Sequence, residues 1–100
     1  MPSAADIAAF LRRVRAAVDG GRVVLSDYAV EGADELGWEP WDVRAQLREL
    51  GPEDWFRCEE SVALPGDLLW VFTPELWDGD SLWIRLLERN GIVVVSFHRG

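Results

Sequence analysis

The sequence has no lysine, a single cysteine and a single histidine among its 100 residues. One cysteine excludes an internal disulfide, and Cys58 with His98 is too small a set for a structural zinc site. Any metal site would therefore consist of carboxylates, and we expect none. No apolar run approaches the roughly 20 residues of a membrane span, and the N-terminus lacks the pattern of a secretory signal. These absences predict a cytoplasmic protein without a membrane segment.

Length and charge bound the class of protein further. A chain of 100 residues that is 49% hydrophobic predicts one globular domain over residues 1–100. Its formal net charge of −8 argues against a generic nucleic-acid binder, which usually has a basic patch. The charge is uneven, because residues 26–80 carry the acidic excess while residues 1–25 and 81–100 are each +2. The acidic centre is a docking surface for a basic partner or simply a solvated surface.

Three helices are predicted in the first half of the chain. A capping box at Ser3 begins an apolar helical pattern that Gly20 stops. Ser26 caps a second helix over residues 28–36, and a third begins at Pro40 and ends before Gly51. The short apolar segment 23–25 joins the first two.

The second half of the chain predicts strands. Runs rich in aromatic and β-branched residues occupy residues 55–60, 68–73, 82–88 and 92–97, and turn-forming pairs separate them. Helices followed by strands predict an α+β fold, in which N-terminal helices pack on one face of a twisted antiparallel sheet.

A hairpin brings together the residues of greatest chemical interest. Asn90-Gly91 between two apolar runs predicts a two-residue loop. The resulting register pairs Arg89 with Ile92, Leu87 with Val94, Leu86 with Val95, Arg85 with Ser96, Ile84 with Phe97 and Trp83 with His98. Side-chain alternation then gives a core face of Ile84, Leu86, Val95 and Phe97 and an opposite face of Trp83, Arg85, Ser96 and His98.

The opposite face of the hairpin carries candidate catalytic groups. His98 is the only side chain whose unperturbed pKa lies near neutral pH, so it is the candidate general acid or base. Arg85, with Arg57 on a neighbouring strand, is a candidate phosphate ligand, and Trp83 is a candidate stacking platform. Each has a simpler alternative: a surface histidine, arginines in salt bridges and a rim aromatic. Cys58 alternates with Arg57 and is expected to be buried and inert.

Several segments resemble the MqsR family of type II toxins, which share the RelE/ParE-like fold. The resemblance covers roughly residues 10–99 in order. Its segments are Val14-Arg15-Ala16-Ala17-Val18 with Gly21-Arg22-Val23, Ala33-Asp34-Glu35-Leu36-Gly37, Leu50-Gly51-Pro52-Glu53-Asp54-Trp55-Phe56-Arg57, Trp70-Val71-Phe72 with Pro74, and Val94-Val95-Ser96-Phe97-His98.

This resemblance implies a metal-independent endoribonuclease that cleaves mRNA without a cofactor. The resemblance places Arg57, Trp83 and His98 at positions that match the family, and the hairpin register adds Arg85 and Ser96 beside them. Together they predict His98, Arg57 and Arg85 as catalytic residues, and Trp83 and Ser96 as substrate-binding residues. Here Arg57 stands where the family usually has lysine, and Trp83 where it often has tyrosine. The implied partners are RNA and a cognate antitoxin with a zinc-binding part and a helix-turn-helix. The alternative is a non-catalytic acidic binding module on the same fold, such as an inactive toxin relative or an immunity-like protein.

Overall fold

A computed structural model describes residues 1–62 and 65–100 of the chain. Within this part, three α-helices precede most of the sheet: α1 (Ala4–Asp19), α2 (Asp27–Glu35) and α3 (Pro40–Glu49). Their starts follow the predicted capping residues. Ser3 Oγ accepts a hydrogen bond from the Asp6 amide (3.1 Å), and Ser26 Oγ accepts one from the Ala29 amide (3.1 Å). The caps satisfy amide groups that the first helical turn leaves unpaired, and they confirm the predicted helix starts.

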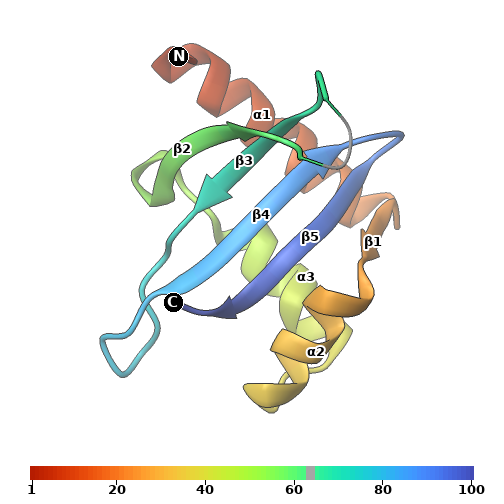
Figure 1. The fold of residues 1–100 in the computed structure, drawn as a ribbon, viewed down its shortest axis with the longest axis vertical. Helices are drawn as coiled ribbons and strands as arrows, with labels where there is room; N and C mark the ends of the chain where they lie inside the picture. Colours follow the sequence, from red (N-terminus) through yellow and green to blue (C-terminus); the bar gives the residue numbers. More distant parts are fainter. Residues whose placement is uncertain (63–64) are drawn as a thin grey trace.

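Five strands in the described residues form one mixed sheet in the order β1-β5-β4-β3-β2 (Figure 1). They are β1 (Val23–Leu25), β2 (Trp55–Glu60), β3 (Leu68–Phe72), β4 (Leu82–Glu88) and β5 (Ile92–Arg99), with a 3₁₀-helix at Pro52–Asp54 before β2. The α+β class is therefore correct, but the expectation of a wholly antiparallel sheet is wrong. The connecting segment between α1 and α2 is a strand, and it runs parallel to β5. A three-residue run is too short to show strand periodicity, so only its pairing with β5 reveals it.

The helices cover one face of the sheet and leave the other open. In Figure 1, α1 and α3 lie behind the sheet, while α2 lies at the end of β1. A continuous core fills the space between the layers. Phe10 of α1 stacks on Trp70 of β3 with ring centroids 4.2 Å apart, and Val43 and Leu47 of α3 are fully buried. None of the helices in the described residues is long and apolar enough to cross a membrane.

The β4–β5 hairpin has the predicted register at its far end and a shifted one near the loop. Trp83 pairs with His98, Ile84 with Phe97 and Arg85 with Ser96, as predicted. Beyond Arg85 a bulge moves the register by one residue, so that Leu86 pairs with Val94, Leu87 with Val93 and Glu88 with Ile92.

The shift changes the core face of the hairpin. Val94 is fully buried in place of Val95, which is only half-buried, so the prediction for Val95 is wrong. The turn is also one residue longer than predicted, because Glu88 rather than Arg89 pairs with Ile92. Inward- and outward-facing side chains still alternate along the strand before the extra residue and again after it. The sequence of the strand alone therefore does not reveal the bulge.

Candidate functional site

An aromatic and cationic cluster lies on the open face of the sheet, and we call Phe56, Arg57, Glu59, Trp83 and Arg85 the open-face cluster. The Cζ atoms of Arg57 and Arg85 lie 5.7 and 5.0 Å from the ring centroid of Trp83. Phe56 packs edge-on against the same ring, with centroids 5.6 Å apart. Three residues predicted for the site, Arg57, Arg85 and Trp83, therefore do come together. Their contacts are cation–π interactions, which order the two guanidinium groups.

Glu59 holds both guanidinium groups of this cluster. Its carboxylate accepts hydrogen bonds from Arg57 Nε (2.8 Å) and Arg85 Nε (3.0 Å). The hydrogen bond from Arg85, and then that from Arg57, lowers the pKa of Glu59, so it is ionised at neutral pH. Arg57 keeps half of its side chain exposed, whereas Arg85 is 26% exposed. The salt-bridge alternative for these arginines is thus realised, and one carboxylate offsets half of their charge.

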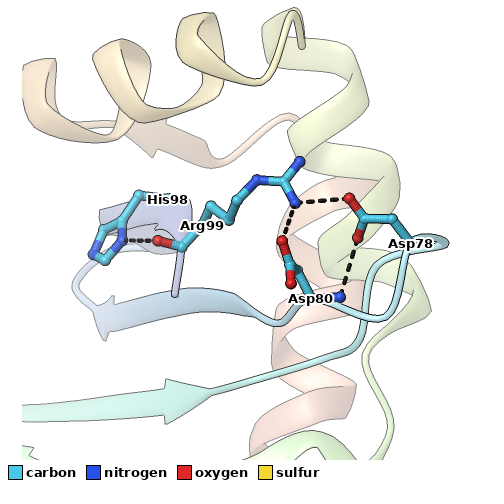
Figure 2. Close-up of polar contacts among 4 residues, drawn as sticks. All are labelled: Asp78, Asp80, His98 and Arg99. Carbon is cyan, nitrogen blue, oxygen red and sulfur yellow. Dashed lines mark hydrogen bonds and ion pairs between the residues drawn. The ribbon is translucent and has the colours of Figure 1, made fainter.

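His98 lies on β5 beside Trp83 but contacts a helix, which the sequence did not predict. Its ring meets that of Tyr28, in the first turn of α2, with centroids 5.9 Å apart. Nδ1 of His98 lies 2.9 Å from the carbonyl oxygen of Arg99, on the opposite side from the Arg99 guanidinium (Figure 2). A carbonyl oxygen only accepts hydrogen bonds, so we assign the proton of the neutral ring to Nδ1. Nε2 is then the nitrogen that can accept a proton.

The close approach of α2 to β5 explains why His98 is only half-exposed. A Cβ atom added to Gly32 would lie 1.8 Å from the Phe97 carbonyl oxygen and 3.2 Å from the His98 Cβ. A small cavity of about 230 Å³ lies here, lined by Tyr28, Glu31, Gly32, Glu35, His98 and Arg99. His98 is thus the predicted cross-strand neighbour of Trp83, with Phe97 buried, but the expectation that its face is free of helix contacts is wrong at this end of the strand, because α2 packs there. No signal within the sequence of β5 shows which helix packs against its end.

Ser96 contributes little surface to the site. It pairs with Arg85 as predicted, but only 5% of the residue is exposed. A serine that is this well covered presents almost no hydroxyl to a substrate. Its predicted role in binding therefore finds no support in the structure.

Arg99 forms an ion-pair network that sequence analysis did not single out. Its Nη1 contacts a carboxylate oxygen of Asp78 (2.8 Å) and one of Asp80 (2.6 Å). Figure 2 shows both aspartates reaching Arg99 from the loop between β3 and β4. The hydrogen bond from Arg99 is the main cause that lowers the pKa of Asp78. The network ties this loop to the end of β5, beside His98.

Two further hollows differ in character. An acidic groove of about 550 Å³ is lined by Gln46, Glu49, Glu53, Asp54, Thr73, Pro74 and Glu75. A larger, more apolar groove of about 630 Å³ lies between the start of α1 and the β2–β3 edge, where Cys58 and Leu68 line it.

Cys58 faces the helices, opposite Arg57, but it is half-buried rather than fully buried. Burial raises the pKa of its thiol, which is consistent with the expected low reactivity.

Comparison with known proteins gives no family for this chain. No family model matches the sequence, and no curated protein is similar to it. Among residues 1–62 and 65–100, no group of three or more His, Cys, Asp or Glu side chains could hold a metal ion. The chemistry of the site therefore rests on the open-face cluster and His98.

Proposed function

We propose that this protein is the toxin of a type II toxin–antitoxin system and cleaves mRNA as a metal-independent endoribonuclease. One observation carries the proposal: two arginines converge on the ring of Trp83, whose cross-strand neighbour is the only histidine in the chain. Guanidinium groups bind phosphate, an aromatic ring stacks on a base, and an imidazole transfers protons. Together these groups meet the needs of RNA cleavage by a neighbouring ribose hydroxyl.

In the proposed reaction the RNA supplies its own nucleophile. The 2′-oxygen attacks the adjacent phosphorus, the bond from phosphorus to the 5′-oxygen breaks, and a 2′,3′-cyclic phosphate and a 5′-hydroxyl form. Nε2 of His98 accepts the proton of the 2′-hydroxyl, the leaving 5′-oxygen takes a proton from solvent water, and His98 then returns its proton to the solvent. Arg57 and Arg85 stabilise the extra negative charge on the pentacoordinate phosphorus. No step requires a cofactor.

The pairing of Glu59 with the two arginines of the cluster depends on whether RNA is bound. With no RNA bound, its carboxylate occupies both guanidinium groups. A phosphate offers more acceptor oxygens and more negative charge, so it can displace part of this pairing. The cation–π contacts with Trp83 keep the arginines in place when the ion pairs weaken.

The partner in this proposal is a cognate antitoxin that covers the open face of the sheet. Its zinc-binding part and helix-turn-helix are what the resemblance to MqsR toxins implies, and cytoplasmic action follows because mRNA is the substrate. The partly exposed Trp83 and Phe56 are suitable contacts for a covering protein, since aromatic residues are enriched at interfaces.

An RNA-cleavage assay in a metal chelator tests the proposal. We expect purified wild-type protein to cut RNA, and His98→Ala to lose about 10²- to 10⁴-fold in rate, the usual contribution of a general acid or base. Arg57→Ala and Arg85→Ala should also lose activity through weaker phosphate binding. Arg12→Ala, which changes an exposed arginine on α1, is the matched control and should cut like the wild type.

A modified RNA substrate gives a second test of the proposed reaction. An RNA with a 2′-deoxyribose at the cleaved position should resist cutting, because the nucleophile is missing. If the wild type cuts no RNA, or if His98→Ala cuts equally well, the proposed mechanism is wrong.

The acidic groove favours a second candidate function, a non-catalytic module that binds a basic protein. Glu49, Glu53, Asp54 and Glu75 gather there, and Glu59 already occupies both arginines of the open-face cluster. Two results together would favour this module: the protein binds a basic protein tightly, with an affinity that falls as salt is added, and it shows no affinity for RNA even at low salt.

A further inference from the structure

Strand β2 ends the sheet, and no described strand pairs with its outer edge. An uncovered edge strand presents backbone N–H and C=O groups that another strand can pair with. The opposite edge is different, because β1 has only three residues and α2 follows it directly. β2 has six residues, and after a bulge at its start, residues 57–60 pair regularly with β3. This edge is therefore the place where the sheet can extend.

The charges along β2 are complementary to those of the same strand in reverse. In an antiparallel pair of two β2 strands related by a two-fold axis, directly opposite residues must lie on the same face. One residue of β2 must therefore lie opposite the same residue of the second copy, at the two-fold axis. If that residue is Cys58, Arg57 of each copy lies opposite Glu59 of the other. Centring it on Arg57 or on Glu59 would instead place like charges opposite each other, which is unfavourable. Only the Cys58-centred register is favourable among these three.

Exposed apolar side chains flank this edge on both faces of the sheet. Phe56 packs on Trp83 of the open face and is 47% exposed. Leu68 lines the groove on the helix side and is 43% exposed. A strand added to β2 would cover apolar surface on both sides of the ladder, which adds to the backbone pairing.

We infer that β2 is a self-association surface, on which a second copy of this chain pairs antiparallel in the register that sets Cys58 opposite Cys58. The result is a ten-stranded sheet across two copies, with two Arg57–Glu59 pairs bridging the junction. The ladder is short, so the dimer is weak. This inference goes beyond the proposed function and does not depend on RNA cleavage.

Charge reversal with complementation tests the register. Arg57→Glu gives a strand with acids at both positions, and Glu59→Arg gives one with arginines at both. Each variant alone should raise the dissociation constant of the dimer by about tenfold or more, because like charges meet twice. An equimolar mixture should restore association, because the two strands are then complementary. Sedimentation equilibrium of the wild type, each variant and the mixture measures these outcomes.

A matched control and a second readout complete the experiment. Arg48→Glu makes the same change of charge at an exposed ion pair on α3, and it should associate like the wild type. Cys58 is only half-buried, so prolonged treatment with a short bismaleimide at mildly alkaline pH should link two copies through it, since opposite Cβ atoms in a ladder lie about 4.5–5.5 Å apart. The linked dimer should disappear in each variant and return in the mixture.

Two outcomes would overturn the inference. A wild type that stays monomeric at millimolar concentration would leave the edge to a strand of another protein. A wild type that associates, while the mixture of variants does not, would place the contact on another surface or in another register.

Discussion

At the scale of single residues, Glu59 decides how strongly charged the open face is. It is 23% exposed and bonds to both Arg57 and Arg85. In this environment its ionised form is favoured, since its pKa is lowered first by the hydrogen bond from Arg85. One carboxylate between two guanidinium groups both orders the arginines and limits their attraction for phosphate.

We predict that Glu59→Gln raises RNA affinity while making the fold less stable. The glutamine leaves both arginines fully charged toward phosphate, and it removes ion pairs worth on the order of 1 kcal/mol. Fluorescence anisotropy with a labelled RNA should show tighter binding by the variant at low salt. Equal or weaker binding would mean that the arginines do not contact RNA.

The stability of the wild type should depend on pH through the same carboxylate. A lowered pKa in the folded state means that the stabilisation is complete above 4.5, the ordinary pKa of this group. It is lost as pH falls through the folded-state pKa. The free energy of unfolding, measured in urea from pH 7 to pH 3, should therefore fall less in Glu59→Gln than in the wild type. Parallel curves would contradict the assignment.

At the scale of elements, α2 is held against β5 by two features that fix the position of His98. Ser26 caps α2 and also donates a hydrogen bond from Oγ to the carbonyl oxygen of Val95, at the bulge (2.8 Å). Gly32 lets the helix backbone approach Phe97 and His98. Ser26 thus connects the start of α2 to the bulge of β5, and Gly32 allows the same helix to pack closely on the end of that strand.

We expect Ser26→Ala to lower the free energy of unfolding by roughly 1–2 kcal/mol. The substitution removes the acceptor of the cap and leaves the Val95 carbonyl without this donor. Urea unfolding followed by tryptophan fluorescence measures the change. A loss below about 0.3 kcal/mol would show that water replaces both bonds at no cost.

Gly32→Ala should be more disruptive than its small size suggests. The added methyl group would lie 1.8 Å from a backbone oxygen, so α2 or β5 must move. We expect a loss of about 1–3 kcal/mol in unfolding free energy and a shifted NMR signal of the His98 ring. Asp34→Ala, an exposed position on the same helix, is the control and should change stability by less than about 0.5 kcal/mol. A normal His98 signal in Gly32→Ala would contradict the proposed contact.

At the scale of the whole molecule, the net charge of −8 opposes RNA binding, while Arg57 and Arg85 of the open-face cluster attract phosphate locally. RNA affinity should therefore be weak. It should also depend on salt in a way set by the few arginines that reach phosphate.

With two arginine–phosphate contacts to a single strand, we predict that affinity falls about sevenfold between 50 and 200 mM salt. A titration of labelled RNA at several salt concentrations gives the slope. A clearly steeper slope would indicate that further arginines contribute, and binding independent of salt would contradict a phosphate contact.

The sequence by itself determined the local elements and part of their pairing. Capping residues set the helix starts, β2 and β4 were predicted with their observed ends, and the pairs from Trp83–His98 to Arg85–Ser96 followed from alternation. Such patterns act over a few residues, so a local reading captures them.

Only the tertiary structure decided what surrounds the candidate residues. The parallel pairing of β1 with β5 and the packing of α2 on His98 join segments far apart in the chain, and the bulge at Val95 depends on how β4 and β5 settle against the rest of the fold. Glu59 is two residues from Arg57, but its bond to Arg85 depends on which strands are neighbours. These arrangements are stabilised by contacts between residues distant in the sequence, because the partners of a side chain are fixed only when the helices pack on the sheet. A single sequence shows which groups are present, and the packed fold determines which of them meet.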